Sequence, residues 1–136
     1  MVTPTTPRPL HVLIADDQAT IRVALSALIR GQGHAVEAVE DGRAALEAAL
    51  RHEFDVVLLD IQMPVLDGLE VARRLRWRLP AGPRPWLVAY TADADEEDRA
   101  AYLAAGLDEV LVKPAGLASL GRVLARGLVG AGAVVN

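Results

Sequence analysis

Short apolar segments alternate with helical patterns along this chain, and the alternation restricts the fold more than any other feature. The apolar segments are His11–Ala15, Ala35–Val39, Val56–Leu59, Trp86–Tyr90 and Glu109–Val112. Each has the length of a strand, and most lack the polar alternation of a strand with one exposed face. Because a helical pattern follows each segment, we predict five strand–helix units that form a parallel sheet with helices on both faces.

The helical patterns stop at residues that break helices, such as Gly31 and Pro80. The fourth pattern places Ala100, Leu103 and Ala104 at helical spacing, so these three residues are expected to face the sheet. Residues 80–85 contain three prolines and are expected to form a stiff surface loop.

The chain length of 136 residues suits one domain, and its 52% hydrophobic share is sufficient for a core. We expect residues 1–9, rich in Pro and Thr, to be disordered, residues 10–128 to form the domain, and residues 129–136 to be a flexible tail. The absence of cysteine excludes disulfides, thiolate metal sites and cysteine nucleophiles.

Charge and hydropathy limit the classes of partner and the cellular location that we expect for this protein. The net charge of −4, together with an expected absence of Lys/Arg-rich runs, argues against direct binding to nucleic acid or to an anionic membrane surface. No apolar run reaches the roughly 18 residues of a membrane-spanning helix, and residues 1–9 lack the apolar region of a secretory signal. These features predict a cytoplasmic protein with no membrane span in this chain.

One edge of the predicted sheet collects charged and hydroxyl side chains. Asp16 and Asp17 come after the first strand, Asp60 after the third, Thr91 after the fourth and Lys113 after the fifth. In an open parallel sheet, ligand sites form outside the carboxyl ends of the strands. The five residues are therefore candidates for one site.

Each candidate also has a purely structural explanation. The Asp16-Asp17 pair could cap the following helix, Thr91 could be a turn hydroxyl, and Lys113 could be one solvated lysine among many charges. The neighbouring Asp67-Gly68 pair is interpreted as turn and helix-entry chemistry rather than as a ligand.

The structural explanations have to hold for all of these residues at once. Three carboxylates gathered at one edge repel one another unless a cation lies among them. Oxygen ligands without Cys or paired His favour a hard ion, and Mg²⁺ before Ca²⁺ or Zn²⁺. An Asp carboxylate beside Mg²⁺ is a competent nucleophile toward phosphorus and gives an aspartyl phosphate. Thr91 and Lys113 supply the hydroxyl and the ammonium that hold phosphoryl oxygens.

Four motifs in this order resemble the receiver domain of two-component response regulators, over about residues 10–128. They are residues 12–17 (Val-Leu-Ile-Ala-Asp-Asp), residues 58–68 (Leu-Leu-Asp-Ile-Gln-Met-Pro-Val-Leu-Asp-Gly), Thr91-Ala92 and Lys113-Pro114. The resemblance implies an α/β, flavodoxin-like fold, a doubly wound sheet of five parallel strands in the order 2-1-3-4-5 with five helices. Residues 60–64 and 101–109 look like those of receivers attached to hybrid histidine kinases.

The resemblance also implies a role for each residue of the site. Asp60 would accept a phosphoryl group from the phosphohistidine of a histidine kinase or histidine phosphotransfer protein. Asp17 and Asp60 would bind Mg²⁺ directly, Asp16 would act mostly through water, and Gln62 would contribute its backbone carbonyl.

Further roles implied by the resemblance concern the phosphorylated state. Thr91, Ala92 and Lys113 would bind the phosphoryl oxygens, with Thr91 moving toward them on activation. Gln62 and Asp93 would tune the lifetime of the phosphoryl group. The protein would be a signalling phosphoacceptor, with no enzymatic activity beyond its own Mg²⁺-dependent phosphorylation and dephosphorylation. The face made of the fourth helix, the fifth strand and the fifth helix would be the surface for a homodimer.

Two positions depart from the family pattern. Receivers commonly carry an aromatic switch residue three positions before the lysine, and this chain has Val110 there. The residue after Lys-Pro is often large and apolar, and here it is Ala115. Both departures bear on the relay to the output face and leave the phosphorylation chemistry unchanged.

Three other classes of protein share parts of this pattern. A dinucleotide-binding domain needs a Gly-rich first turn, and the turn after the first strand has two aspartates and no glycine. A phosphatase of the haloacid dehalogenase type carries a second Asp two positions after its nucleophile, where this chain has Gln62. A phosphorylation-independent receiver-like interaction module is the third alternative, and formation of an aspartyl phosphate distinguishes it.

Overall fold

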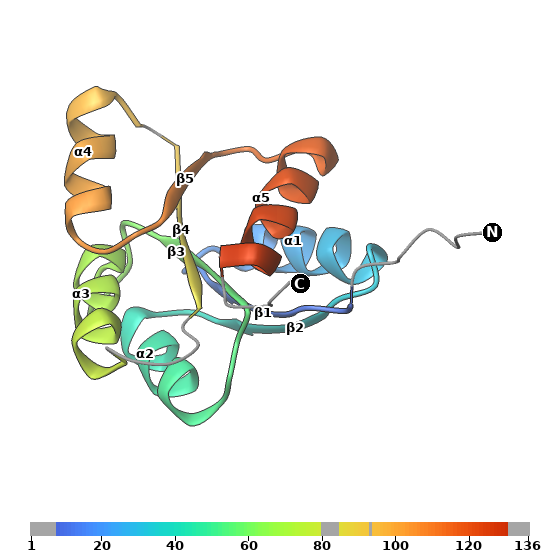
Figure 1. The fold of residues 1–136 in the computed structure, drawn as a ribbon, viewed down its shortest axis with the longest axis horizontal. Helices are drawn as coiled ribbons and strands as arrows, with labels where there is room; N and C mark the ends of the chain where they lie inside the picture. The colour runs from blue at the N-terminus through green and yellow to red at the C-terminus, as the bar shows by residue number, and fades with distance from the viewer. Residues whose placement is uncertain (1–7, 80–84, 93, 131–136) are drawn as a thin grey trace.

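The structure, a computed structural model, describes residues 8–79, 85–92 and 94–130. In these ranges, strands and helices alternate strictly, as predicted (Figure 1). The strands are β1 (His11–Ala15), β2 (Ala35–Val39), β3 (Val56–Asp60), β4 (Trp86–Thr91) and β5 (Glu109–Val112). The helices are α1 (Ala19–Gly31), α2 (Gly42–Arg51), α3 (Gly68–Arg78), α4 (Glu96–Ala104) and α5 (Leu117–Gly130).

Element boundaries differ slightly from those expected. β3 and β4 each extend one residue further, to Asp60 and Thr91, and α5 continues to Gly130. The proposed loop at residues 80–84 and most of the two proposed flexible ends, residues 1–7 and 131–136, lie outside the described residues. Arg8, at the start of the described chain, forms an ion pair with Asp55 at 2.6 Å.

All strand pairs are parallel, and the sheet order is β2-β1-β3-β4-β5, which confirms the predicted flavodoxin-like topology. The central strand β3 is buried along its whole length. Its sequence, Val-Val-Leu-Leu-Asp, is therefore apolar on both sides, as a strand covered on both faces requires.

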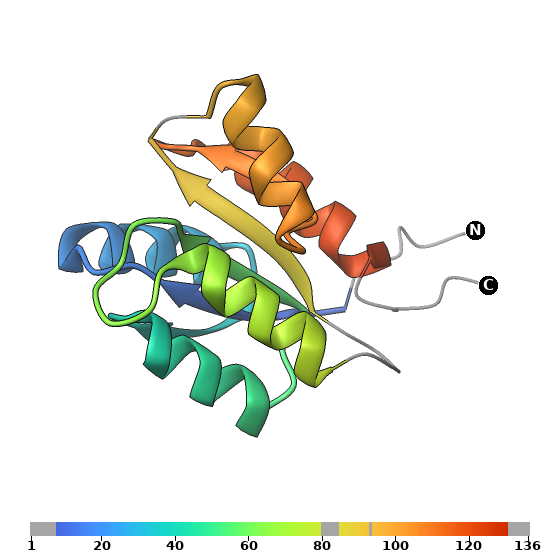
Figure 2. The same ribbon diagram turned by 90° about the vertical axis from the view of Figure 1, so that its left-hand side faces the viewer.

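Helices cover both faces of the sheet (Figures 1 and 2). α1 and α5 pack on one face, where Leu25, Ile29 and Leu120 meet side chains of the central strands. α2, α3 and α4 lie on the other face, where Val71 and Leu75 of α3 belong to the core. Within the described residues, no helix has both the length and the apolar character needed to cross a lipid bilayer.

Helix α4 is rotated relative to the sequence-based prediction. Ala100, Leu103 and Ala104 are exposed, so the prediction that they face the sheet is wrong. The buried residue of this helix is Tyr102, which joins the core on the α2–α3 side. An aromatic ring removes far more surface from water than an alanine does, so one Tyr outweighs the Ala and Leu pattern in setting the helical phase.

The loop from β3 to α3 closes tightly over the end of β3. Asp67 caps α3 by accepting a hydrogen bond from the Glu70 amide at 2.9 Å, which confirms its interpretation as helix-entry chemistry. A Cβ on Gly68 would lie 2.4 Å from the carbonyl oxygen of Asp60, closer than such atoms can approach. Gly68 thus allows α3 to begin directly beside the last residue of β3.

Candidate functional site

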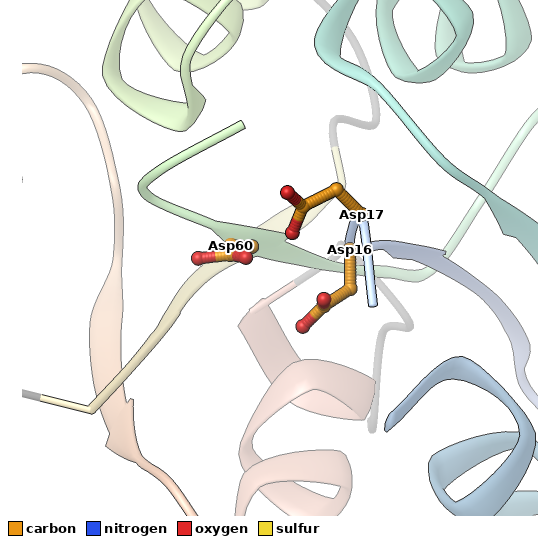
Figure 3. A group of neighbouring side chains, drawn as sticks. All are labelled: Asp16, Asp17 and Asp60. Carbon is orange, nitrogen blue, oxygen red and sulfur yellow. The ribbon is translucent and has the colours of Figure 1, made fainter. Parts of the chain in front are cut away.

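The structure brings the three predicted carboxylates together at the carboxyl edge of the sheet (Figure 3). Asp16 and Asp17 follow β1, and Asp60 ends β3. Oxygen atoms of the three side chains lie within 4.8 Å of one another. Asp16 and Asp60 are buried and Asp17 is exposed, so the group spans the boundary between the core and the solvent.

Lys113, the only lysine of the chain, connects this carboxylate group to β5. Its Nζ atom lies 2.9 Å from Oδ2 of Asp16 and 3.4 Å from Oδ2 of Asp60. The ammonium also stands over the ring of Tyr90, 5.1 Å from its centroid. With 15% of its side chain exposed, Lys113 is not the solvated lysine of the structural alternative.

Asp16 is held on both of its carboxylate oxygens. Oδ2 accepts from Lys113, and Oδ1 accepts from the backbone amide of Gln18 at 2.8 Å. Gln18 is the N-cap of α1, and no side chain caps that helix, so the capping explanation for the Asp16-Asp17 pair does not hold.

A pocket of about 520 Å³ opens beside the carboxylates. Its walls come from the loops after β1, β3, β4 and β5 and from α4. The lining residues are Asp17, Gln18, Asp60, Ile61, Gln62, Thr91, Ala92, Asp98, Tyr102 and Lys113. All predicted site residues that the structure describes line this pocket, except Asp16, which has no exposed surface behind Lys113. Asp93 lies outside the described residues.

The charges of the site are strongly coupled. Burial raises the pKa of Asp60, and the Asp16 charge adds to that effect, while Lys113 and the Gln62 amide oppose it. Burial disfavours the charge of Lys113, but its hydrogen bond to Asp16 and the charges of Asp60 and Asp16 outweigh this, so the pKa of Lys113 is raised. Three carboxylates face one ammonium, which leaves an excess of negative charge at the edge of the sheet.

The donor set of the site fits a magnesium ion. Carboxylate oxygens are hard ligands, and the described cluster contains no His or Cys. A divalent cation would balance the excess negative charge, and the exposed Asp17 leaves an open side for water and substrate oxygens.

Sequence patterns did not reveal several residues of the site, among them two on α4 and one on β4. Asp98 and Tyr102 reach the pocket from α4, and the Tyr90 ring lies beneath the Lys113 ammonium. The Tyr90 hydroxyl also accepts a hydrogen bond from the backbone amide of Ala115 at 3.4 Å. The signal that could have indicated these two tyrosines is the scarcity of aromatic residues, since this chain has only five Phe, Trp and Tyr residues and two of them are at positions 90 and 102.

The two departures from the family pattern lie on opposite faces of the sheet. Val110 packs against the core on the α2–α4 side, the same core that contains Tyr102. Ala115 packs against the core beneath α1 and α5.

Comparisons with known proteins agree with this site. The family model of the response regulator receiver domain matches residues 12–125. The autoinducer 2 sensor kinase/phosphatase LuxQ of Vibrio vulnificus is 39% identical over 119 residues, which cover 82% of this chain and 14% of LuxQ. The response regulator MprA of Mycolicibacterium vanbaalenii is 38% identical over 112 residues, which cover 82% of this chain and 47% of MprA. This chain thus spans less than half the length of either relative.

A solved receiver-domain structure is also similar to this chain in sequence and in fold. The receiver domain of the sensor histidine kinase PA1611 from Pseudomonas aeruginosa matches with a TM-score of 0.78 and 32% identity, over 89% of this chain and 98% of that domain. That crystal structure has a magnesium ion coordinated in its active site cleft. Because the family model covers most of the chain and the fold and the acidic edge agree with it, the chain belongs to the response regulator receiver domain family.

Proposed function

We propose that this receiver is a phosphoacceptor in a two-component phosphorelay and that Asp60 receives the phosphoryl group. The observation that carries the proposal is the position of Asp60, buried at the end of β3 yet open to the pocket, with Lys113 3.4 Å from its carboxylate. The donor would be the phosphohistidine of a histidine kinase or a histidine phosphotransfer protein.

Transfer requires one bond to form and one to break. A carboxylate oxygen of Asp60 attacks the phosphorus atom, the bond from phosphorus to the donor imidazole breaks, and the imidazole leaves with the electron pair. The carboxylate must be ionised to attack. The Lys113 ammonium and the Gln62 amide, 3.1 Å from Oδ1 of Asp60, both favour the ionised form.

Residues at the acidic edge are proposed to hold Mg²⁺, which would supply positive charge to carboxylate and phosphoryl oxygens. Asp17 and Asp60 would be direct ligands, and Gln62 would add its backbone carbonyl. Asp16, with both oxygens already engaged by Lys113 and Gln18, suits an indirect role through water.

The groups around the pocket would hold the phosphoryl oxygens. Lys113 would pair with one oxygen, and the Thr91 hydroxyl and the Ala92 amide would bind others. Gln62 lines the pocket beside Asp60 and would limit the access of hydrolytic water, a role proposed for Asp93 as well. These residues would set the lifetime of the phosphoryl group on Asp60.

Helix α4 is proposed to carry the output of phosphorylation. Val110 has no ring to swing and few side-chain rotamers, so β5 lacks an aromatic switch. Asp98 and Tyr102 reach the pocket from α4, which supports a relay through this helix. Leu103, Val112 and Leu117 are exposed on α4, β5 and α5, and these apolar side chains would contribute to a homodimer through that face.

Phosphotransfer from a phosphorylated histidine phosphotransfer protein tests the proposal. Radioactive phosphate should move to this chain only with Mg²⁺ and should be lost in base, as expected of an acyl phosphate. The phosphorylation-independent alternative predicts no transfer from any donor. A phosphatase of the haloacid dehalogenase type predicts continuous release of phosphate from small phosphate esters.

We also propose, from the similarity to LuxQ, that the chain is the receiver of a hybrid kinase and lies on the cytoplasmic side of the membrane.

A further inference from the structure

The outward side of α3 carries an aromatic and basic face that the phosphoacceptor site does not use. Glu70, Arg73, Arg74 and Trp77 line a shallow depression on this helix. The inward side of α3 packs into the core, so these residues point to solvent. Trp77 is 77% exposed, the highest exposure of any large hydrophobic residue in the part of the chain that the structure describes. We call these four residues and Arg78 the α3 face.

Local pairing accounts for only part of the charge on the α3 face. Glu70 contacts Nη1 of Arg73 at 3.5 Å and Nε of Arg74 at 3.1 Å, which uses one nitrogen of each guanidinium. Arg78, in the last turn, is also exposed. Three arginines against one glutamate give the face a net positive charge in a chain whose net charge is −4.

The neighbouring Arg76, in contrast, has a structural role, because its side chain binds residues of another part of the fold. Its Nε donates to the carbonyl of Gly106 at 2.8 Å, and its Nη2 pairs with Asp108 at 2.5 Å. Arg76 thus ties α3 to the turn before β5. The exposed arginines have no such cross-element contact among the hydrogen bonds and ion pairs described, and neither packing nor helix formation requires an exposed tryptophan at position 77.

We propose that the α3 face docks an acidic peptide segment of a partner protein, in addition to the phosphoacceptor role. Guanidinium groups bind carboxylates in a bidentate manner, and Trp and Arg are the residues most enriched among those that dominate binding energy. Carboxylates of the segment would pair with Arg73, Arg74 and Arg78, and an apolar side chain of the segment would cover Trp77.

The charge distribution favours an acidic peptide over a nucleic acid. The α3 face lies on one helix of 11 residues, and Glu70 lies within it, where it would repel a closely spaced row of phosphates. The negative charge of the rest of the chain would repel a long polyanion further. A short peptide can place isolated carboxylates to either side of Glu70.

Binding of a short fluorescein-labelled peptide of Glu, Leu and Ala to the whole chain tests this proposal. Fluorescence anisotropy should show saturable binding that weakens with salt, and the peptide with Gln in place of Glu should bind at least about tenfold more weakly. The double variant Arg73→Glu, Arg74→Glu should bind the Glu peptide more weakly by a similar factor. Trp77→Ala should weaken binding by a similar factor as well. Arg122→Glu, an exposed charge reversal on α5 across the sheet, is the control and should bind like the unmodified chain.

Three results would overturn the proposal. These are equal binding of the Glu and Gln peptides, binding that survives the changes at Arg73 and Arg74, or tighter binding of a labelled single-stranded oligonucleotide of the same charge. Quenching of tryptophan emission by iodide gives an independent readout on the unmodified chain. The peptide should protect the exposed Trp77, whereas half-buried Trp86, which donates to Glu109 at 2.7 Å, should contribute little change. No protection at saturating peptide would also contradict docking at this face.

Discussion

The ammonium of Lys113 lies 2.9 Å from Oδ2 of Asp16, a carboxylate with no exposed surface, and only 3.4 Å from Oδ2 of the neighbouring Asp60. β5 is thereby linked to β1 across two intervening strands through a single buried ion pair. A phosphoryl group on Asp60 would compete with Asp16 for this ammonium. The resting contact therefore provides a direct route from the chemistry of the site to the position of the loop after β5.

Removal of the Lys113 charge should destabilise the protein and at the same time spare its metal site. Lys113→Ala leaves Asp16 buried without its partner, and losses of this kind cost about 3 kcal/mol of unfolding free energy. Mg²⁺ affinity should be unchanged or tighter, because a nearby positive charge is removed. Urea unfolding with and without Mg²⁺ measures both effects, and Lys113→Arg is the charge-conserving control. A large loss of Mg²⁺ affinity in Lys113→Ala would contradict this arrangement.

The raised pKa of Asp60 predicts how stability depends on pH. The folded state holds the Asp60 proton more tightly than the unfolded chain, so this stabilising contribution is complete below the ordinary pKa of 3.8 and is lost as pH rises through the raised value. Without Mg²⁺ at neutral pH, Asp60→Asn should therefore have a higher free energy of unfolding than the unmodified chain. The advantage should disappear toward pH 3.8.

Asp55 provides the matched control for this pH dependence. Burial alone would raise its pKa, but hydrogen bonds from Arg8 and from the His11 amide lower it overall. Its contribution to stability is thus present at neutral pH and lost on acidification. Asp55→Asn should destabilise the protein at neutral pH, opposite in sign to Asp60→Asn. If both variants changed stability in the same direction, the electrostatic account of Asp60 would be wrong.

Val65, in the loop after β3, holds strain that a substitution can remove. Its φ of +72° is a left-handed conformation that β-branched residues strongly disfavour, and its side chain is 73% exposed. Val65→Gly should raise the unfolding free energy by about 1 kcal/mol, because it relieves the strain and loses little packing. Thermal unfolding measures the change. The exposed Val23 on α1, whose backbone is helical, is the control, since Val23→Gly should destabilise the protein, by about 0.4 kcal/mol from helix propensity alone.

Because β5 has no aromatic switch, phosphorylation should either be relayed through α4 and the loop before it, or this receiver should mainly store the phosphoryl group and pass it on. A beryllofluoride mimic of the phosphoryl group on Asp60 should shift the amide NMR signals of residues 60–68 and 91–100, and that of Tyr102. A partner responds only through different affinities for the two states, so the moving surface marks the output. Equally large shifts centred on Val110 and continuing along α5 would show that the missing aromatic does not matter.

The alternating α/β architecture and the edge of the sheet where five candidate residues meet could be predicted from the sequence, because both depend on chain order, whereas the strand order followed from the resemblance to receiver domains. Strict alternation allows few arrangements other than a doubly wound sheet, and residues at strand ends must then share one edge. The relative distances of Lys113 from Asp16 and Asp60 could not be predicted, because they depend on side-chain packing against the Tyr90 ring.

Two other features were not predicted from the sequence, for different reasons. The phase of α4 depends on how Tyr102 packs against the sheet, and a stripe of small apolar residues carries little information about phase. The expectation that the chain has no Lys/Arg-rich run is wrong, because residues 73–78 include four arginines, of which those at positions 73, 74 and 78 are exposed. These become a basic face only once α3 turns its other side to the core.

Intact-protein mass spectrometry after incubation with acetyl phosphate tests the central claim most directly. With Mg²⁺, the chain should gain the mass of one phosphoryl group, and a chelator should abolish the gain. Asp60→Asn should gain nothing, whereas the exposed Asp67→Asn, which alters only the cap of α3, should still be phosphorylated. Stable phosphorylation of Asp60→Asn at another residue, or phosphorylation of the unmodified chain that persists without a divalent cation, would contradict the account.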